Sequence, residues 1–387
     1  MTVRVCTPRY LNIGRGALGG IAEILDRMGG VKNPLIVTDR FMVDFGITGQ
    51  VQTLLHKAGL ASGVFDAVLP DPTDTVVLAG VDALEAGGHD AVIGLGGGSP
   101  IDASKAIAVM AKGSRNIQDY RPPKQSDTPG LPVLAIPTTA GTGSEVTHHA
   151  VIIHDATREK ISCRGEGFVP TAAIVDFELT LSKPKRLIAD NGLDTLTHAI
   201  EAYVSRKATL FSDRIALDCM RLVASNLEPA YDDPENLAAR EALMLAATFG
   251  GLAFSNASIA LVHAMSRPLG SLFHVPHGMS NAMLLPTVTA FSKEAAQARY
   301  AQCARVIGMA EENTPDAKAT DMLVEGLYAM NDRLDVPSLS GFGIDHAAYS
   351  NAAGQMADDA VRSGAPANNP RVGSVEEITD LFHEAWG

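Results

Sequence analysis

The stretch Ala91–Lys105, AVIGLGGGSPIDASK, decides the fold predicted for the first half of the chain. Apolar residues lead into Gly96, Gly97 and Gly98, and Ser99-Pro100 then begins a helix. Glycines let a backbone approach a ligand closely, and a helix start offers free N–H groups and a favourable dipole, so this unit can bind a pyrophosphate. The spacing is not G-x-G-x-x-G, and a tight glycine turn with no ligand is the alternative.

Other short apolar segments of the first half follow the same pattern of a strand and then a helix. We expect buried strands at Leu35–Thr38, Val133–Ile136 and Ala173–Val175 as well as at 91–95. The predicted helices lie between them, around residues 15–28, 41–59, 74–87 and 100–112. Strands that alternate with helices imply right-handed crossovers and a parallel sheet. We therefore predict a doubly wound α/β domain over residues 1–181.

The pattern changes near residue 182, where Ser182-Lys183-Pro184 has the Ser and Pro of a helix start. Beyond this point the sequence predicts only helices, rich in Ala, Leu and Met, and we assign residues 182–387 to an all-helical domain. Helix breaks are expected near Asn191-Gly192, Asp232–Pro234, Pro268, Pro286 and Pro337.

Composition restricts the class of protein. A chain of 387 residues favours two domains, and 46% hydrophobic with 19% charged residues is typical of a soluble globular protein. The net charge of −13 argues against a nucleic-acid partner, which needs a basic surface. Four scattered cysteines without a C-x-x-C spacing and an N-terminus without an apolar signal segment favour the cytoplasm.

The segment 242–266 contains no Asp, Glu, Lys or Arg. It is long enough to cross a membrane, but it includes several polar residues and stands alone, so a buried helix in a soluble domain is the better interpretation. We expect no membrane partner. His263 falls in this segment and should be deeply buried, and a buried polar group needs a partner, of which a metal is one.

Four residues of the second half form a candidate metal site. Asp194 and His198 have the i,i+4 spacing that places both side chains on one helical face. His263 and His277 lie fourteen residues apart, and the breakers between them predict that the second histidine sits on a loop or at a new helix start. One carboxylate and three imidazoles are a plausible ligand set for Fe or Zn. Each histidine alone has the alternative of a surface or hydrogen-bonded core residue.

Two further features point to a dinucleotide. A second polar loop, Pro137–Glu145 (PTTAGTGSE), follows a predicted strand, and hydroxyls and glycines at the carboxyl end of a strand are typical of the ligand crevice in an open parallel sheet. Asp39 directly follows the strand LIVT. A carboxylate there can accept a hydrogen bond from the adenosine ribose and repel a 2′-phosphate, which favours NAD over NADP; a simple turn Asp is the alternative.

With these residues in view, the chain resembles the iron-containing (group III) alcohol dehydrogenase family. The resemblance extends across nearly the whole chain, in family order: GGGSPID at 96–102, PTTAGTGSE at 137–145, GLDTLTHAIEAY at 192–203, an H-x13-H pair ending in PHG at 276–278, and NPR at 369–371.

This resemblance implies the dehydroquinate-synthase-like fold, with a dinucleotide domain, a helical domain and a cleft between them. It implies that Fe(II), or Zn, is held by Asp194, His198, His263 and His277, and that the protein forms homodimers or larger homo-oligomers. The candidate NAD-binding residues are Asp39, Gly96, Gly97, Gly98, Ser99, Asp102, Thr138, Thr139, Thr142, Ser144, Lys160 and Leu179.

The implied reaction is reversible hydride transfer between nicotinamide and a small alcohol or aldehyde, with the metal acting as a Lewis acid on the substrate oxygen. Three positions depart from the family pattern. Arg267 stands where many members have a histidine regarded as a proton relay, Asp71 where an Asn is common, and His148-His149 follow the polar loop. A permanently charged guanidinium is a poor proton shuttle.

We expect His149, Phe254 and Arg267 to contact the substrate. Our hypothesis is that Arg267 with His149 recognises a carboxylate, phosphonate or sulfonate on the substrate, because a guanidinium binds such groups with two hydrogen bonds. The alternative is that Arg267 pairs with a nearby acid. Competing functions are a maleylacetate-reductase-like or glycerol-dehydrogenase-like oxidoreductase, a dehydroquinate-synthase-like lyase, and a binding protein with a vestigial site.

Overall fold

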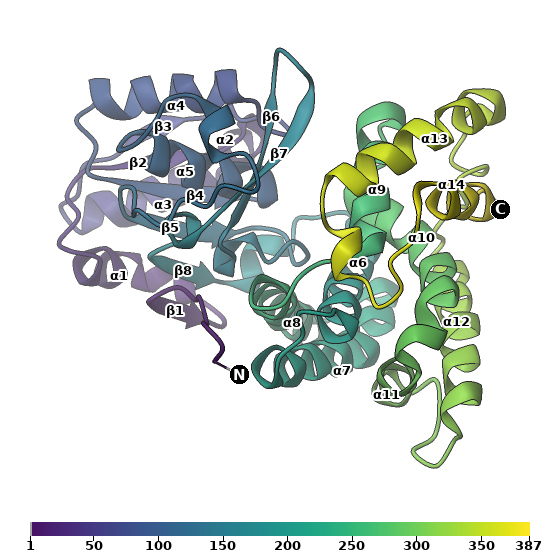
Figure 1. Cartoon of the computed structure of the whole chain (residues 1–387). Helices are drawn as coiled ribbons and strands as arrows, with labels where there is room; N and C mark the ends of the chain where they lie inside the picture. The colour runs from purple at the N-terminus through teal and green to yellow at the C-terminus, as the bar shows by residue number, and fades with distance from the viewer. Residues whose placement is uncertain (1) are drawn as a thin grey trace. The chain divides into compact units, whose positions relative to one another are not determined.

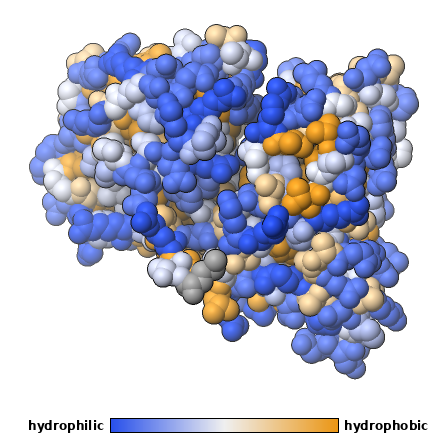
Figure 2. Space-filling view, in the orientation of Figure 1, coloured by the Kyte–Doolittle hydropathy of each residue, from blue (hydrophilic) through white to orange (hydrophobic). Residues whose placement is uncertain are grey.

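The computed structural model describes residues 2–387, which divide into two compact units, 2–182 and 183–387. Figure 1 shows that strands are confined to the first unit and that the second consists of helices. On the face drawn in Figure 2, hydrophilic residues cover most of the surface of both units, and hydrophobic residues occur as scattered patches.

The first unit is built on a six-stranded parallel sheet in the order β1-β8-β5-β4-β2-β3. Its strands are β1 (Tyr10–Ile13), β2 (Pro34–Val37), β3 (Gly63–Phe65), β4 (Ala91–Gly96), β5 (Val133–Pro137) and β8 (Ala172–Val175). An antiparallel hairpin, separate from this sheet, consists of β6 (His149–His154) and β7 (Glu159–Arg164).

Helices cover both faces of this sheet because successive residues of its central strands point to opposite sides. Leu35 and Val37 of β2 pack into a hydrophobic cluster with α4 (Asp74–Ala86) and α5 (Gly98–Met110), whereas Ile36 packs into a second cluster with α1 (Ile21–Arg27) and α3 (Ile47–Lys57). The helices of this unit are α1 (Ile21–Arg27), α2 (Arg40–Asp44), α3 (Ile47–Lys57), α4 (Asp74–Ala86) and α5 (Gly98–Met110), with short 3-10 turns η1 (Ala17–Gly20), η2 (Ile117–Tyr120), η3 (Ser144–Val146), η4 (Glu166–Phe168) and η5 (Phe177–Thr180). The predicted doubly wound α/β architecture is confirmed.

The second unit packs its helices around one hydrophobic core. They are α6 (Lys185–Val204), α7 (Leu210–Asp232), α8 (Leu237–Ser255), α9 (Leu261–Phe273), α10 (His277–Ser292), α11 (Gln297–Ile307), α12 (Asp316–Arg333), α13 (His346–Arg362) and α14 (Val375–Glu384), with 3-10 turns η6 (Lys293–Ala296) and η7 (Pro366–Asn368). The all-helical character predicted for the second half is confirmed across the described residues.

Helix α8 is the one helix among residues 2–387 whose length and composition would allow it to cross a membrane. Of its most apolar window, 56% is buried inside the structure, and α8 packs against α6 and α7. It is thus a core helix, as the sequence predicted for this uncharged segment. The segment extends beyond α8 into α9, which holds His263 with 3% of its surface exposed.

Three of the expected helix breaks are wrong. Helix α6 runs without interruption past Asn191-Gly192, and Pro268 and Pro286 lie inside α9 and α10. A Cβ on Gly192 would approach a methyl group of Leu227 to 2.3 Å, so this glycine allows α6 and α7 to pack closely instead of ending a helix. Both prolines are buried, and packing against the core outweighs the one hydrogen bond that each removes.

The sequence also missed four strands. Strand β1 is a half-exposed edge strand and β3 has three residues. Strands β6 and β7 form a two-stranded hairpin outside the main sheet, and β7 begins with the charged pair Glu159-Lys160. Strands β1 and β7 lack the continuous apolar run that marks a strand buried on both faces, and β3 is too short to show one, which is why these three were not recognised. Strand β6 does contain such a run, Ala150–Ile153, and the prediction overlooked it.

Candidate functional site

Helix α6 presents three acidic or basic side chains on one face. Asp194, His198 and Glu201 follow the i, i+4, i+7 spacing, which returns to nearly the same side of an α-helix. Each has no more than 4% of its surface exposed. Because buried charges require partners, this face must be met by other polar groups.

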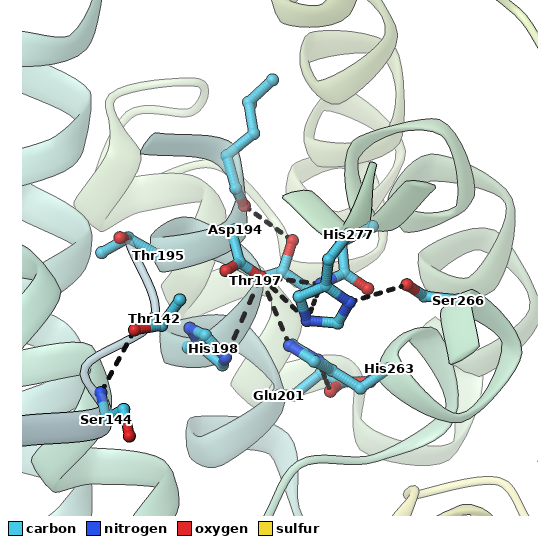
Figure 3. A network of polar contacts seen from close by, with 12 residues as sticks. Thr142, Ser144, Asp194, Thr195, Thr197, His198, Glu201, His263, Ser266 and His277 are labelled. Atoms are coloured by element: carbon cyan, nitrogen blue, oxygen red, sulfur yellow. Dashed lines mark hydrogen bonds and ion pairs between the residues drawn. The ribbon is translucent and has the colours of Figure 1, made fainter. Parts of the chain in front are cut away.

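The partners come from α9 and α10. Helix α9 ends at Phe273, the left-handed backbone of the following His274 (φ 56°) turns the chain, and α10 then begins at His277. The two histidines His263 and His277 therefore project from two different helices toward α6, as Figure 3 shows. The prediction that His277 sits at a new helix start is confirmed, although the turn lies at His274–Pro276 and not at Pro268.

The three imidazoles converge on one carboxylate oxygen. Asp194 Oδ1 lies 3.9 Å from His198 Nε2, 3.5 Å from His263 Nε2 and 3.7 Å from His277 Nε2. The amide of Asn281 donates to the same oxygen at 2.7 Å. The side chain of His277 is 50% exposed, so the cluster is open to solvent on one side.

The electrostatics of the cluster favour a cation. Burial alone would raise the pKa of Asp194, but the facing imidazoles of His198, His277 and His263 hold that pKa well below its usual range. Burial would lower the pKa of His263, but the carboxylates of Glu201 and Asp194 raise it to about 9. Two buried carboxylates thus stabilise positive charge in their midst.

This donor set fits a divalent transition metal. Ligand atoms of Asp194, His263 and His277 all lie within 4.8 Å of one another, and His198 adds a third imidazole nitrogen near the same carboxylate oxygen. Imidazole and carboxylate ligands suit Fe and Zn. His263 also donates through Nδ1 to a carboxylate, which is the outer hydrogen bond common among metal-ligating histidines.

In the first unit, three loops meet at the carboxyl edge of the sheet. Strand β4 lies between β2 and β5, so the residues that follow these three strands are neighbours. From β2 the chain continues to β3, toward one edge of the sheet, whereas from β4 it continues to β5, toward the opposite edge. This is a topological switch point, at which open α/β sheets bind ligands.

The glycine loop after β4 is shaped for close approach. Gly96 has φ 146°, and a Cβ there would lie 2.6 Å from the Pro100 ring, so a side chain does not fit. Helix α5 begins at Gly98 with Gly97 as its N-cap, and a glycine has no side chain that could bond the free N–H groups of the first turn. These N–H groups are available to a phosphate.

The threonine loop after β5 lies against this glycine loop. The Thr138 N–H donates to the Gly96 carbonyl at 2.9 Å, and the side chains of Thr139 and Thr142 border Gly97 and Gly98. Among residues 2–387, the hydroxyls of Thr138 and Thr139 belong to the few buried polar groups without a hydrogen-bond partner. Such groups call for a ligand or water, and a bound nucleotide would satisfy them.

Asp39 caps helix α2 directly after β2. Its Oδ1 accepts from the Met42 N–H at 2.9 Å, whereas Oδ2 faces Gly96, 3.5 Å from where a Cβ would stand. One carboxylate oxygen is therefore directed toward the glycine loop at the switch point, as an interaction with a ribose hydroxyl would require.

The comparisons with known proteins find similarity along nearly the whole chain. Residues 8–177 match the iron-containing alcohol dehydrogenase family, and residues 188–386 match the C-terminal part of the Fe-containing alcohol dehydrogenase family. The chain is 35% identical to the lactaldehyde reductase of Escherichia coli over 379 residues, which cover 96% of this chain and 97% of that protein.

The chain belongs to the iron-containing alcohol dehydrogenase family.

Two solved structures show how closely the fold is shared. A 1,3-propanediol oxidoreductase superimposes with a TM-score of 0.95 at 32% identity, covering 100% of both chains. The sulfoacetaldehyde reductase of Bifidobacterium kashiwanohense, solved with NAD⁺, superimposes with a TM-score of 0.89 at 29% identity, covering 100% of this chain and 99% of that one. The predicted family, fold class and oxidoreductase activity are thereby confirmed for this iron-containing alcohol dehydrogenase.

Some candidate cofactor-binding residues of this alcohol dehydrogenase form contacts with other residues of the protein. Asp102 accepts from the Ser144 hydroxyl and from the Val151 N–H, and Lys105 lies 3.6 Å from its carboxylate. Leu179 is buried in the cluster beneath the sheet. Asp102 and Ser144 thus help to shape the loops, and the assignment of these residues and of Leu179 to cofactor binding stays a prediction, as it does for Asp39, Gly97 and the threonines.

Lys160 and Ser99 meet at Asp71. Lys160 Nζ donates to Asp71 Oδ1 at 2.9 Å, and the Asp71 N–H donates to the Ser99 hydroxyl at 3.2 Å. Asp71 holds a left-handed backbone with φ 57°. The acid that replaces the common Asn thus pairs with Lys160, and this pair borders the start of α5.

The candidate substrate residues belong to different units. Phe254 stacks on His198 with ring centroids 4.4 Å apart, so it lies beside the metal cluster. Arg267 stands one turn after His263 on α9 and is half-buried. His149 is the first residue of β6 in the first unit, where its ring packs against His148 with centroids 4.1 Å apart.

The sequence reasoning missed Glu201, Asn281 and Lys105. Glu201 lies within the quoted motif GLDTLTHAIEAY, seven residues after Asp194, and Asn281 is four residues after His277. Helical spacing from the candidate ligands could have identified both. Lys105 likewise stands three residues after the candidate Asp102, but its hydrogen-bond partners lie far along the chain in the loop 144–149, which helical spacing does not reveal.

Proposed function

We propose that this protein is an NAD(H)-dependent alcohol dehydrogenase or aldehyde reductase that holds Fe(II) with Asp194, His198, His263 and His277. The observation that carries the proposal is the convergence of three imidazole nitrogens on Asp194 Oδ1 at 3.5 to 3.9 Å. Zn would fit the same side chains, because one carboxylate and three imidazoles do not discriminate between the two metals.

The side chains of the helical unit, residues 183–387, would position the substrate. Bound Fe(II) would supply a Lewis acid for the substrate oxygen, and NAD would carry the hydride. The exposed side of His277 leaves a path from solvent into the cluster. Phe254 stacks on His198 and covers that imidazole with an apolar ring.

The loops of the first unit would bind the cofactor. The N–H groups at the start of α5 and the hydroxyls of Thr138 and Thr139 suit a pyrophosphate. The Oδ2 atom of Asp39 would accept from an adenosine ribose hydroxyl, and its charge would repel a 2′-phosphate, so we propose NAD over NADP. The related sulfoacetaldehyde reductase, solved with NAD⁺, supports this choice.

For the substrate we propose a small alcohol or aldehyde, and our more specific hypothesis is that it bears an anionic group. The relatives act on both kinds, since lactaldehyde is neutral and sulfoacetaldehyde carries a sulfonate. Arg267, one turn from His263 and half-buried, has the chemistry to bind such an anion. We further propose a cytoplasmic homodimer or larger homo-oligomer, for which the four free cysteines fit a reducing compartment.

The test is NADH oxidation by metal-free, Fe(II)-loaded and Zn-loaded protein with neutral, carboxylate-, phosphonate- and sulfonate-bearing aldehydes. We expect turnover only with metal, and its loss in His263→Ala. The control is His383→Ala, an exposed histidine of α14 in the same unit, which should retain activity. Turnover by the metal-free protein, or none with any metal, would contradict the proposal; a lyase would cycle NAD without net oxidation of NADH.

A further inference from the structure

Glu201 is a buried carboxylate that the proposed mechanism does not use. It lies on the same face of α6 as Asp194 and His198, and its side chain is 3% exposed. Burying a carboxylate is costly unless several donors bind it, so its partners indicate what it is for.

All three of its hydrogen bonds go to one short segment at the start of α9. Oε2 accepts from the Ala260 N–H at 2.8 Å and from His263 Nδ1 at 2.6 Å. Oε1 accepts from the Val262 N–H at 2.6 Å. One carboxylate therefore binds the backbone and the metal-ligand histidine of the same turn.

The backbone bonds replace a missing helix cap. Ala260 is the N-cap of α9, and alanine has no side chain that can bond the free N–H groups of the first turn. Glu201 supplies that acceptor from α6, and its charge also faces the positive end of the α9 dipole. The first turn of α9, and with it His263, is thereby held at a set distance from α6.

The side-chain bond sets which nitrogen of His263 is free to bind a metal. In a neutral imidazole one nitrogen carries the proton and the other has a lone pair. Donation from Nδ1 to Glu201 keeps a proton on Nδ1, so Nε2, 3.5 Å from Asp194 Oδ1, is the nitrogen that gives up its proton and offers a lone pair when a metal binds. His277 has a weaker arrangement, in which Nδ1 lies 3.3 Å from the Ser266 hydroxyl.

We propose that Glu201 is a positioning residue: it fixes the tautomer and the placement of His263 and so sets the metal affinity of the site. The inference rests on the proposed metal site. Carboxylates that bind a metal-ligating histidine typically raise metal affinity 10- to 100-fold.

The experiment uses the full chain with Co(II) as the probe. Its dissociation constant is measured by calorimetry and by the d–d absorption bands, for wild type, Glu201→Gln and Glu201→Asp. We expect about 10- to 100-fold weaker binding and altered bands in Glu201→Gln, with partial recovery in Glu201→Asp. The control is Glu377→Gln, which alters the capping box of α14 away from the cluster and should leave the dissociation constant unchanged.

A second variant separates positioning of His263 from capping of α9. Adding Ala260→Ser to Glu201→Gln provides α9 with a cap of its own, and we expect the melting temperature to recover while Co(II) binding stays weak. Wild-type affinity in Glu201→Gln, or full recovery of affinity in the double variant, would overturn the inference. Failure of the wild type to bind Co(II) would instead overturn the proposed function.

Discussion

Lys105 illustrates how single buried residues hold the nucleotide loops. Its ammonium group donates to the Ser144 hydroxyl at 2.9 Å, to the Thr147 hydroxyl at 3.0 Å and to the His149 carbonyl at 2.8 Å. It therefore ties α5 to the end of the threonine loop and to the start of β6. Burial lowers its pKa to about 8, although the nearby carboxylate of Asp102 raises it.

This depressed pKa predicts a pH dependence of stability. Below pH 8 the folded protein bears the full cost of a buried charge. As pH rises, the folded chain releases this proton before the unfolded chain, whose pKa is 10.5, and the cost declines. Urea titrations of wild type and of Lys105→Met give the free energy of unfolding of each protein. We expect the difference, wild type minus variant, to rise by about 2 kcal/mol between pH 7 and 9.5. A difference that is constant with pH would contradict this.

At Asp39 the charge can be removed while the helix cap is kept. An Asn at this position still accepts from the Met42 N–H through Oδ1, so α2 should stay capped. Without the negative charge, the 2′-phosphate of NADPH is no longer repelled. We expect the preference for NADH over NADPH, as a ratio of kcat/KM, to fall about tenfold in Asp39→Asn. An unchanged ratio would mean that Asp39 serves only as a turn residue.

Arg267 is the residue at which the anionic and the neutral class of substrate can be tested against each other. If its guanidinium binds a substrate anion, Arg267→Ala should lower kcat/KM for carboxylate- or sulfonate-bearing aldehydes about 10- to 100-fold more than for neutral ones. Arg267→Lys keeps the charge but not the paired donors and should fall between. Equal losses on both classes would remove the specificity hypothesis and leave Arg267 a structural role.

At the scale of secondary-structure elements, the metal cluster depends on how closely α10 approaches α6. Gly278, the second residue of α10, has no room for a side chain: a Cβ would lie 2.3 Å from the Asp190 carbonyl and 3.3 Å from the Asp194 Cβ. The glycine next to His277 therefore lets the start of α10 touch the backbone of the helix that carries Asp194.

Gly278→Ala should push α10 away from α6 and separate His277 from Asp194. We expect a loss of stability of about 1–3 kcal/mol and weaker Co(II) binding, measured by thermal unfolding and by calorimetry. Gly354→Ala is the matched control, because Gly354 is an exposed residue of α13 and a Cβ there would meet no atom within 4 Å. That variant should be stabilised by up to about 1 kcal/mol.

At the scale of the whole molecule, we expect metal binding to stabilise one of the two units and not the other. The four candidate ligands all lie in 183–387. Metal at a concentration 100 times its dissociation constant should stabilise that unit by about 2.7 kcal/mol. Hydrogen exchange should therefore slow in α6, α9 and α10 on loading and stay unchanged in the sheet of the first unit. Protection of the sheet to the same extent would contradict this separation.

Much of the architecture was predictable because it is encoded locally. The buried strands of the parallel sheet appear as short apolar runs, and the helices between them follow at regular spacing. The stretch 91–105 folds as predicted, into β4, the glycine loop and α5. Gly192, Pro268 and Pro286 misled the prediction because their local preference against helix is outweighed by packing that no local pattern reveals.

The sequence by itself determined the family, the doubly wound and all-helical halves, and the pairing of Asp194 with His198 on one helical face, because each depends on residue type and short spacing along the chain. Only the tertiary structure decided that His263 and His277 meet that face from two further helices. It also decided that Glu201 binds the start of α9, 59 to 62 residues away. Contacts of that range follow from helix packing, since a side chain's distant partner depends on where the core places the second helix.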